Sequence, residues 1–305
     1  MCSSDLEATP ILTPSPLAGR RVSRMNGAGN RILVLDLRGG AGVPTPAEAR
    51  AIHRAPGLDY DQLMVLSDPR QAQTLAYLSI YNNDGSLAGA CGNGTRCVAD
   101  RLARQTGADS LTLETSAGLI ACERLGPWTY RVDMGPPRLA WNEIPLARPV
   151  ADTREVDLPL DGSRFGAASV VNMGNPHAVF FVGDVAGIDL ERWGPRYETH
   201  PIFPEKANIS FAEVRARDWI MLRVWERAVG ATLACGSAAC ATLVSAAGLG
   251  LTDRAARVDL PGGELVIEWR EGDDRVLMTG PVEFEREVVL ESGMFSATPN
   301  EPIYY

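Results

Sequence analysis

The sequence predicts an α+β fold of two pseudo-symmetric domains, each a curved, mostly antiparallel sheet wrapped around a central helix, with an active site in the interdomain cleft. Three features of the chain lead to this prediction. One cysteine motif occurs twice, other motifs repeat at the same spacing, and short strand-like segments flank two helices rich in small residues. Mixed segments of this kind are typical of α+β proteins.

Three landmarks of the chain repeat at an almost constant spacing. The segment ACGNGTRCVA starts at Ala90 and ACGSAACATL starts at Ala234, so their first cysteines are 144 residues apart. Two further pairs repeat 145 residues apart, Gly-Asn at 29–30 and 174–175 and Gly-Pro at 135–136 and 280–281. Three matches in the same order favour an internal duplication over chance similarity.

Short runs of β-branched and aromatic residues, bounded by turn residues, predict the strands. Two predicted hairpins, at 111–123 and 258–269, occupy matching places in the repeat. The individual strands are expected at 31–37, 74–82, 111–117, 169–173, 178–184, 208–214 and 219–228.

A helix is predicted directly after each repeated cysteine. After Cys91, Val98 and Leu102 are one turn apart on a helix that ends at Gly107. After Cys235, the segment GSAACATLVSAAG is apolar on all sides and ends at Gly248, which predicts a buried helix. Each cysteine therefore stands at the N-terminal end of the helix in its domain.

The 305 residues are enough for two domains and a sizeable core. Residues 1–20, which contain several prolines and two acidic residues, are expected to form a disordered tail. The N-terminal domain is expected to comprise 21–133 together with 279–305, and the C-terminal domain 134–278.

The composition excludes several classes of partner. A formal net charge of −9 without any run of lysine or arginine argues against binding to nucleic acid. No stretch approaches the roughly 18 apolar residues of a membrane span. The first residues do not resemble a signal peptide, so we expect a cytoplasmic protein whose six cysteines are free thiols.

The two helix-terminal cysteines suggest acid–base chemistry. Unpaired N–H groups and the helix dipole stabilise a thiolate, which predicts a thiol pKa lowered by roughly one unit. Two thiolates in one cleft would repel each other, so one thiolate and one thiol are expected. Such a pair removes a proton from one face of a carbon atom and delivers one to the other face, which inverts a stereocentre.

The same two helix openings supply backbone N–H groups that suit a carboxylate beside the reacting carbon. No cofactor is expected, because the single lysine, Lys206, lies in no recognisable phosphate loop. No metal is expected either, because the cysteines lack CxxC spacing and the three histidines are scattered. Three other cysteines are expected to be small core residues: Cys97, Cys122 and Cys240.

Several motifs together resemble the diaminopimelate epimerase family. They are MNGAGN, YDQL, YNNDGS, CGNGTRC, NMGNPH, KANISF, RVWERAVGATLACGSAAC, VDLPGGELVIEW and MTGP, which occur in the family's order over about residues 22–285. Cofactor-independent proline and hydroxyproline racemases are similar in fold and in using two cysteines, but their surrounding motifs differ.

The resemblance implies inversion of LL-2,6-diaminopimelate to the meso form by a cytoplasmic homodimer, in lysine and peptidoglycan precursor synthesis. It implies that Cys91 deprotonates the LL isomer and that Cys235 reprotonates it. The reacting carboxylate would be held by Gly92, Asn93, Gly236 and Ser237. The distal amino-acid centre would be held by Asn30, Asn82, Asn175, Asn208 and Arg227, with Glu226 and Gln62 also at binding positions and His177 near the cysteines.

Some positions depart from the family's usual residues: Asn26, Arg31, Asp59, Ala231 and Ala238. The matched catalytic and carboxylate-binding positions are retained. Two other hypotheses remain open from the sequence, namely an epimerase of another amino acid such as hydroxyproline, and a non-catalytic or thiol-redox protein that uses the same cysteines.

Overall fold

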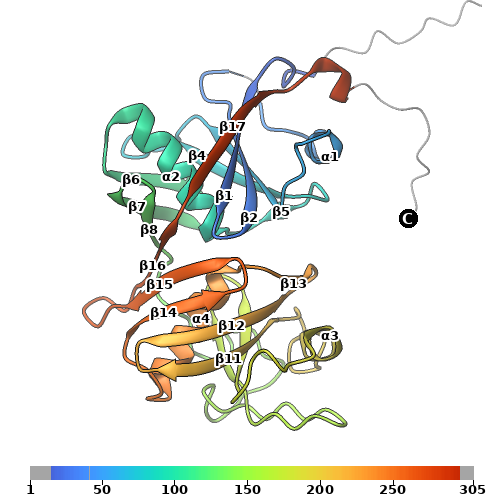
Figure 1. Cartoon of the computed structure of the whole chain (residues 1–305), viewed down its shortest axis with the longest axis vertical. Helices are drawn as coiled ribbons and strands as arrows, with labels where there is room; N and C mark the ends of the chain where they lie inside the picture. The colour runs from blue at the N-terminus through green and yellow to red at the C-terminus, as the bar shows by residue number, and fades with distance from the viewer. Residues whose placement is uncertain (1–14, 41, 296–305) are drawn as a thin grey trace, which may run out of the picture.

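The fold is an elongated arrangement of two halves stacked end to end (Figure 1). The computed structural model describes residues 15–40 and 42–295. Most of the expected disordered tail, residues 1–14, lies outside the described residues. Residues 15–20 differ from that expectation because they form a turn in which Leu17 is fully buried and the Gly19 N–H donates to the Leu290 carbonyl at 2.7 Å.

The first half of the chain forms eight strands and two helices within the described residues. They are, in order, β1 (Arg21–Gly27), β2 (Asn30–Asp36), α1 (Pro46–Arg54), β3 (Gln62–Ser67), β4 (Tyr77–Asn82), β5 (Leu87–Ala88), α2 (Gly92–Thr106), β6 (Ser110–Thr115), β7 (Gly118–Gly126) and β8 (Thr129–Asp133).

The second half has the same order of elements. They are β9 (Ser169–Asn172), β10 (Pro176–Phe181), α3 (Leu190–Glu198), β11 (Asn208–Ala216), β12 (Trp219–Glu226), β13 (Gly230–Thr232), α4 (Gly236–Gly248), β14 (Ala255–Leu260), β15 (Gly263–Trp269) and β16 (Val276–Pro281). The chain then continues through β17 (Glu283–Val289) and a short 3-10 helix, η1 (Ser292–Phe295).

Strand pairing repeats between the halves and confirms the predicted fold class. The parallel pair β2–β3 corresponds to β10–β11, and the parallel pair β4–β6 corresponds to β12–β14. The other strand pairs are antiparallel, including the matching hairpins β6–β7 and β14–β15 that the sequence predicted. Each half is thus a mostly antiparallel sheet, as expected of a duplicated chain.

The strands β16 and β17 tie the halves together. β16 pairs antiparallel with β8, so one hydrogen-bonded ladder runs through both halves. β17 then crosses to the first half and pairs with β1 (Figure 1). We propose on this basis that the described part of residues 279–305 belongs with 21–133, and that 134–278 forms the second domain.

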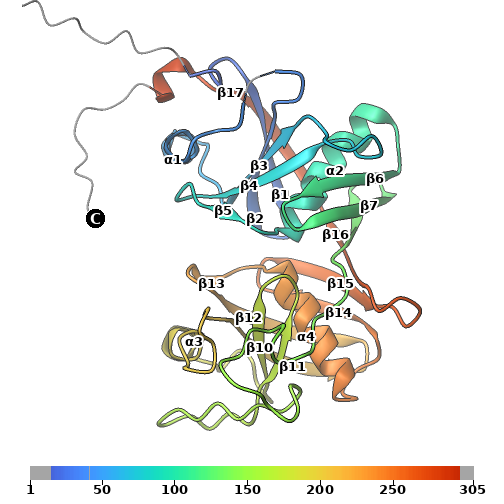
Figure 2. The ribbon, with the colours of Figure 1, turned by 180° about the vertical axis from the view of Figure 1, so that it is seen from behind.

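One helix lies at the centre of each sheet (Figure 2). α2 packs against β1, β2, β3, β6, β7 and β8, and α4 packs against β9, β10, β11, β12, β14 and β15. Cys97 and Cys240 are fully buried in these helices, and Cys122 is 3% exposed, which confirms all three as core residues. Burial of their apolar side chains therefore holds both helices against the strands around them.

The N-terminal ends of α2 and α4 approach each other closely around one side chain of β16. A Cβ atom on Gly92 would lie 2.3 Å from Met278 Cε, and a Cβ atom on Gly236 would lie 2.7 Å from Met278 Sδ. Only glycine fits at the first position of either helix without moving Met278. This close approach brings both helix openings to the boundary between the halves.

The C-terminal end of α2 allows a test of the predicted glycine cap. Gly107 caps the helix with a φ of 76° in otherwise open space, so Gly107→Ala should cost about 1–2 kcal/mol in free energy of unfolding through backbone strain alone. Urea unfolding measures this loss. Gly166→Ala is the control, because its added methyl also meets open space and its φ lies outside the left-handed region. Equal stability of the two variants would contradict the cap assignment.

Candidate active site

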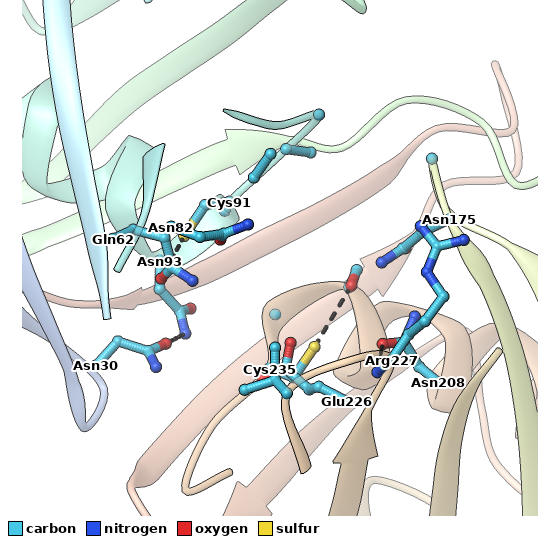
Figure 3. Close-up of a pocket in the computed structure, with 18 of the residues that line it drawn as sticks. Asn30, Gln62, Asn82, Cys91, Asn93, Asn175, Asn208, Glu226, Arg227 and Cys235 are labelled. Atoms are coloured by element: carbon cyan, nitrogen blue, oxygen red, sulfur yellow. Dashed lines mark hydrogen bonds between the residues drawn. The ribbon is translucent and has the colours of Figure 1, made fainter. Parts of the chain in front are cut away.

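A cavity of about 360 Å³ lies where the two helix openings meet, and both repeated cysteines line it (Figure 3). All but one of the residues predicted for the site line this cavity. From the first half these are Asn30, Gln62, Asn82, Cys91, Gly92 and Asn93, and from the second half Asn175, Asn208, Glu226, Arg227, Cys235, Gly236 and Ser237.

Each cysteine is the residue that precedes its helix. Cys91 Sγ accepts a hydrogen bond from the Gly94 N–H at 3.3 Å, and its thiol donates to Gln62 Oε1 at 3.4 Å. Cys235 Sγ lies 3.5 Å from the side-chain Oγ of Ser237 in the first turn of α4, and makes no capping hydrogen bond of the kind that Cys91 makes. The predicted placement at helix N-termini is confirmed, but the two thiols have different surroundings.

The prediction of a lowered thiol pKa is wrong for the substrate-free site. Burial raises the pKa of Cys91 to about 11, although the Gly94 N–H and the Arg96 guanidinium act in the opposite direction. Burial also raises the pKa of Cys235 well above its ordinary value, and the nearby Glu226 carboxylate adds to that rise. Loss of hydration outweighs the helix-end effect, since Cys235 is buried and Cys91 is half-buried. Both groups are therefore thiols at neutral pH.

The openings of α2 and α4 both face the cavity with backbone N–H groups. Gly92 and Asn93 begin one helix, and Gly236 and Ser237 begin the other. The Asn93 amide donates to Asn30 Oδ1, which links the first helix turn to β2. Two helix N-termini at one cavity form a strong anion-binding arrangement.

A second polar group lies on the far side of the cavity, in the second half of the chain (Figure 3). Asn208 Oδ1 accepts from the Arg227 backbone N–H at 3.0 Å, and the Asn208 amide donates to the Pro176 carbonyl at 3.0 Å. The Arg227 guanidinium donates to the Glu205 carbonyl at 3.1 Å. These bonds hold the Arg227 guanidinium and the Asn208 amide in a fixed arrangement at the cavity wall.

Glu226 is a half-buried carboxyl group close to Cys235. Thr232 Oγ1 donates to Glu226 Oε1 at 2.6 Å. Burial raises the pKa of Glu226 above its usual value, partly offset by hydrogen bonds from Thr232 and Cys235. Glu226 therefore hydrogen-bonds to the Cys235 thiol, while its charge also acts on Cys91.

His177 is the predicted site residue that does not line the cavity. It is fully buried on β10, and its Nε2 lies 2.8 Å from Asn175 Oδ1. Burial, with a smaller effect of Arg227, lowers the pKa of His177 to about 3, so the ring is neutral at physiological pH. His177 thus holds the cavity residue Asn175 in place from within the core, through this hydrogen bond.

Sequence reasoning missed Glu198 at the end of α3. Its carboxylate accepts from Trp225 Nε1 at 2.7 Å and from the Ala228 N–H at 3.0 Å, and it lies 3.5 Å from Lys206 Nζ. These contacts fix the turn that carries Glu226 and Arg227, in which Ala228 has a φ of 62°. No local sequence signal identifies Glu198, because its partners Trp225 and Ala228 lie 27 and 30 residues further along the chain.

The described residues contain no group of three potential metal ligands among histidine, cysteine, aspartate and glutamate. A search of the same residues finds no helix long and apolar enough to cross a membrane.

Comparisons with known proteins fit this geometry. The family model for diaminopimelate epimerase matches residues 22–140 and 169–285. The diaminopimelate epimerase of Rhodopseudomonas palustris (strain BisB18) is 54% identical over 284 residues, which cover 92% of this chain and 98% of that protein. A diaminopimelate epimerase of Methylorubrum extorquens is 56% identical over 292 residues, with the same shares covered. The chain belongs to the diaminopimelate epimerase family.

Solved structures share the fold of this family at low sequence identity. A probable proline racemase from Agrobacterium radiobacter K84 superposes with a TM-score of 0.66 at 15% identity, covering 91% of this chain and 94% of that one. A hydroxyproline epimerase from Agrobacterium vitis gives a TM-score of 0.64 at 14% identity, covering 90% and 92%. These similarities concern the fold alone, which a wider group of proteins shares.

Two of the departures from the family's usual residues compensate each other. Arg31 forms ion pairs with Asp59 and, at 2.7 Å, with Asp61. Ala231 is exposed and pairs with Trp225 in the β12–β13 hairpin. None of these side chains lines the cavity, so these departures lie outside the site itself.

The thiol environments predict a pH dependence of alkylation. Below its pKa a thiol gains about tenfold in thiolate per pH unit. In the substrate-free protein, iodoacetamide should therefore modify Cys91 and Cys235 slowly at pH 7, with rates that still rise at pH 9. Mass spectrometry of digested peptides measures each rate, and the denatured protein supplies the reference. A rate that levels off below pH 8 would contradict the raised pKa values.

Proposed function

We propose that the protein inverts one stereocentre of LL-2,6-diaminopimelate to give the meso form, without a cofactor. The observation that carries this proposal is that two thiols, one from each half of a duplicated chain, line a single cavity together with two helix N-termini. Inversion needs a base and an acid on opposite faces of one carbon, and this arrangement supplies both. The family membership supports the choice of substrate.

The first step removes the α-proton of the LL isomer. The Cys91 thiolate takes the proton, the C–H bond breaks, and its electron pair spreads into the adjacent carboxylate. Backbone N–H groups of both helix openings stabilise the charge that accumulates there. When the substrate's α-ammonium binds beside the sulfur, the nearby positive charge lowers the thiol pKa, and Cys91 gives its proton to solvent water to become the thiolate.

The second step returns a proton to the opposite face. The Cys235 thiol donates its proton to the α-carbon, which leaves Cys235 as thiolate and Cys91 as thiol. No net oxidation or reduction occurs, and the reverse reaction uses the same groups with their roles exchanged. After product release, Cys235 takes up a proton from water through the adjacent Glu226 carboxyl group, which returns both cysteines to the thiol form.

The distal amino-acid centre of the substrate would bind the second polar group of the cavity. The Arg227 guanidinium suits the distal carboxylate, since a planar fork binds carboxylate with two parallel hydrogen bonds. The distal ammonium needs hydrogen-bond acceptors. These are provided by the carboxyl group of Glu226 and the amides of Asn30, Asn82, Asn175 and Asn208.

We further propose that the protein is a cytoplasmic homodimer. Analytical sedimentation tests its oligomeric state directly.

Isotope incorporation tests the reaction. In deuterium oxide and without pyridoxal phosphate, each meso product formed from LL-2,6-diaminopimelate should carry one deuterium, at the inverted α-carbon. Mass spectrometry and NMR of the product measure the label. An unlabelled meso product would refute proton transfer from solvent-exchanged thiols.

Cysteine variants separate the reaction from other uses of the thiols. Cys91→Ser and Cys235→Ser should each lower inversion by about two to four orders of magnitude, the usual contribution of a general acid or base. The control Cys122→Ala removes a buried thiol outside the cavity and should keep the activity. A working cycle between dithiol and disulfide, with no inversion, would instead favour a thiol-redox protein.

Arg227 tests the substrate class. Loss of a hydrogen-bonded charge pair costs about 1.5–3 kcal/mol, so Arg227→Met should raise KM for diaminopimelate by about 10- to 150-fold. Steady-state kinetics measure this, with Arg215→Met as control because Arg215 is exposed and pairs with Glu213. If the protein never turns over diaminopimelate and the Arg227 variant epimerises a monocarboxylate such as hydroxyproline normally, the substrate belongs to that class.

A further inference from the structure

Arg96 is a fully buried arginine that the proposed chemistry has not used. Its Nη1 lies 3.5 Å from Met278 Sδ, a weak acceptor. Its Nε and Nη2 have no hydrogen-bond partner, and no carboxylate lies within ion-pair distance, among the residues that the structure describes. A buried guanidinium without an anion is unusual, because arginine is normally buried only when it is paired.

The guanidinium lies directly behind the two helix openings. Met278, which it contacts, packs against the first residues of both α2 and α4, Gly92 and Gly236. A Cβ atom on Gly280 would lie 3.0 Å from Arg96 Cζ, so a glycine in β16 leaves room for the cation. Long helical side chains lean toward the helix N-terminus, and Arg96 therefore reaches from the second turn of α2 toward the cysteine end.

The resting protein offers this cation little compensation. Both adjacent helix ends carry partial positive charge, which disfavours a cation there. The nearest carboxylate on its own helix, Asp100, binds Arg104 at 2.9 Å and the Tyr130 hydroxyl at 3.1 Å. Burial lowers the pKa of Arg96 only to about 10, so the group keeps its charge at neutral pH.

The reaction itself creates the missing negative charge. A thiolate at Cys91 and a charge-rich carboxylate at the helix openings form only during turnover, on the other side of Met278 from the guanidinium. We propose that Arg96 is a positioning residue that acts electrostatically, stabilising the thiolate form of Cys91 and the anion formed between the two helix openings. This inference rests on the proposed function.

Other groups that lie near Cys91 and Arg96 also act on their charge states. Cys91 faces Gln62, and the carboxylates of Glu226 and Asp61 disfavour its thiolate. Arg96 faces the thiols of Cys97 on its own helix and Cys240 on α4, with Met278 on β16. Among the groups of the described chain that act most strongly on the charge of Cys91, Arg96 is the cation.

Alkylation of Cys91 tests the inference without requiring turnover. At pH 8, Arg96→Met should lower the rate of iodoacetamide modification of Cys91 about tenfold, because its pKa would rise by about one unit. Arg96→Lys retains a charge and should restore most of the rate. Tandem mass spectrometry locates the modification, and circular dichroism with thermal unfolding establishes that each variant folds. Arg96→Gln gives the same comparison if Arg96→Met does not fold.

The matched control is Arg101→Met, which removes an arginine of the same helix that pairs at the surface with Glu287 at 2.8 Å. It should leave the alkylation rate unchanged. In turnover, the rising limb of the kcat profile against pH should move up by about one unit in Arg96→Met, while KM stays within about threefold of the wild type.

Two results would overturn the inference: an unchanged Cys91 alkylation rate in a folded Arg96→Met protein, or equal losses in the Met and Lys variants. If the wild-type protein does not epimerise diaminopimelate but its Cys91 alkylation depends on Arg96 as described, the proposed function fails and the electrostatic role of Arg96 stands.

Discussion

The site depends on one packing constraint, the contact of two helix N-termini with the side chain of Met278. Glycine at the first position of both helices permits this contact, since a Cβ atom at either place would overlap Met278. At this contact the two helix openings lie together, so that Cys91 and Cys235, one from each half of the chain, line one cavity. The β8–β16 pairing joins the two halves within the described strand ladder. Catalytic geometry here is therefore a consequence of how the duplicated halves pack.

Local features were predictable from the sequence, and features that depend on distant residues were not. Short motifs predict the start of each helix, the cysteine that precedes it and the Gly107 cap. The structure agrees with all three. The helices α1 and α3 and the pairing of β17 with β1 were not predicted, because short amphipathic segments and long-range registers leave weak local signals. The cavity is lined by every residue that the resemblance supplied except His177, which is buried in the core and hydrogen-bonds to the cavity residue Asn175.

The direction of the thiol pKa shift shows which physical effect dominates in this cavity. The helix end stabilises a thiolate by about 0.3–1 kcal/mol, and this effect can be predicted from the sequence motif. Desolvation depends on how completely the folded chain surrounds the sulfur, and it is the larger effect at both cysteines. A site that keeps its thiols protonated until a substrate ammonium arrives also protects them from oxidation, since the thiolate is the reactive form.

The duplication is not symmetric at its centre, and Arg96 shows why. The spacing that relates Cys91 to Cys235 places Cys240 at the position corresponding to Arg96, and the two side chains face each other across the helix pair. Two guanidinium groups at this point would repel each other in a space that already needs Gly280 to admit one. One cation between two helices acts on both openings, whereas two would be mutually destabilising. A small neutral residue in the second copy is therefore what the chemistry of a shared anion requires.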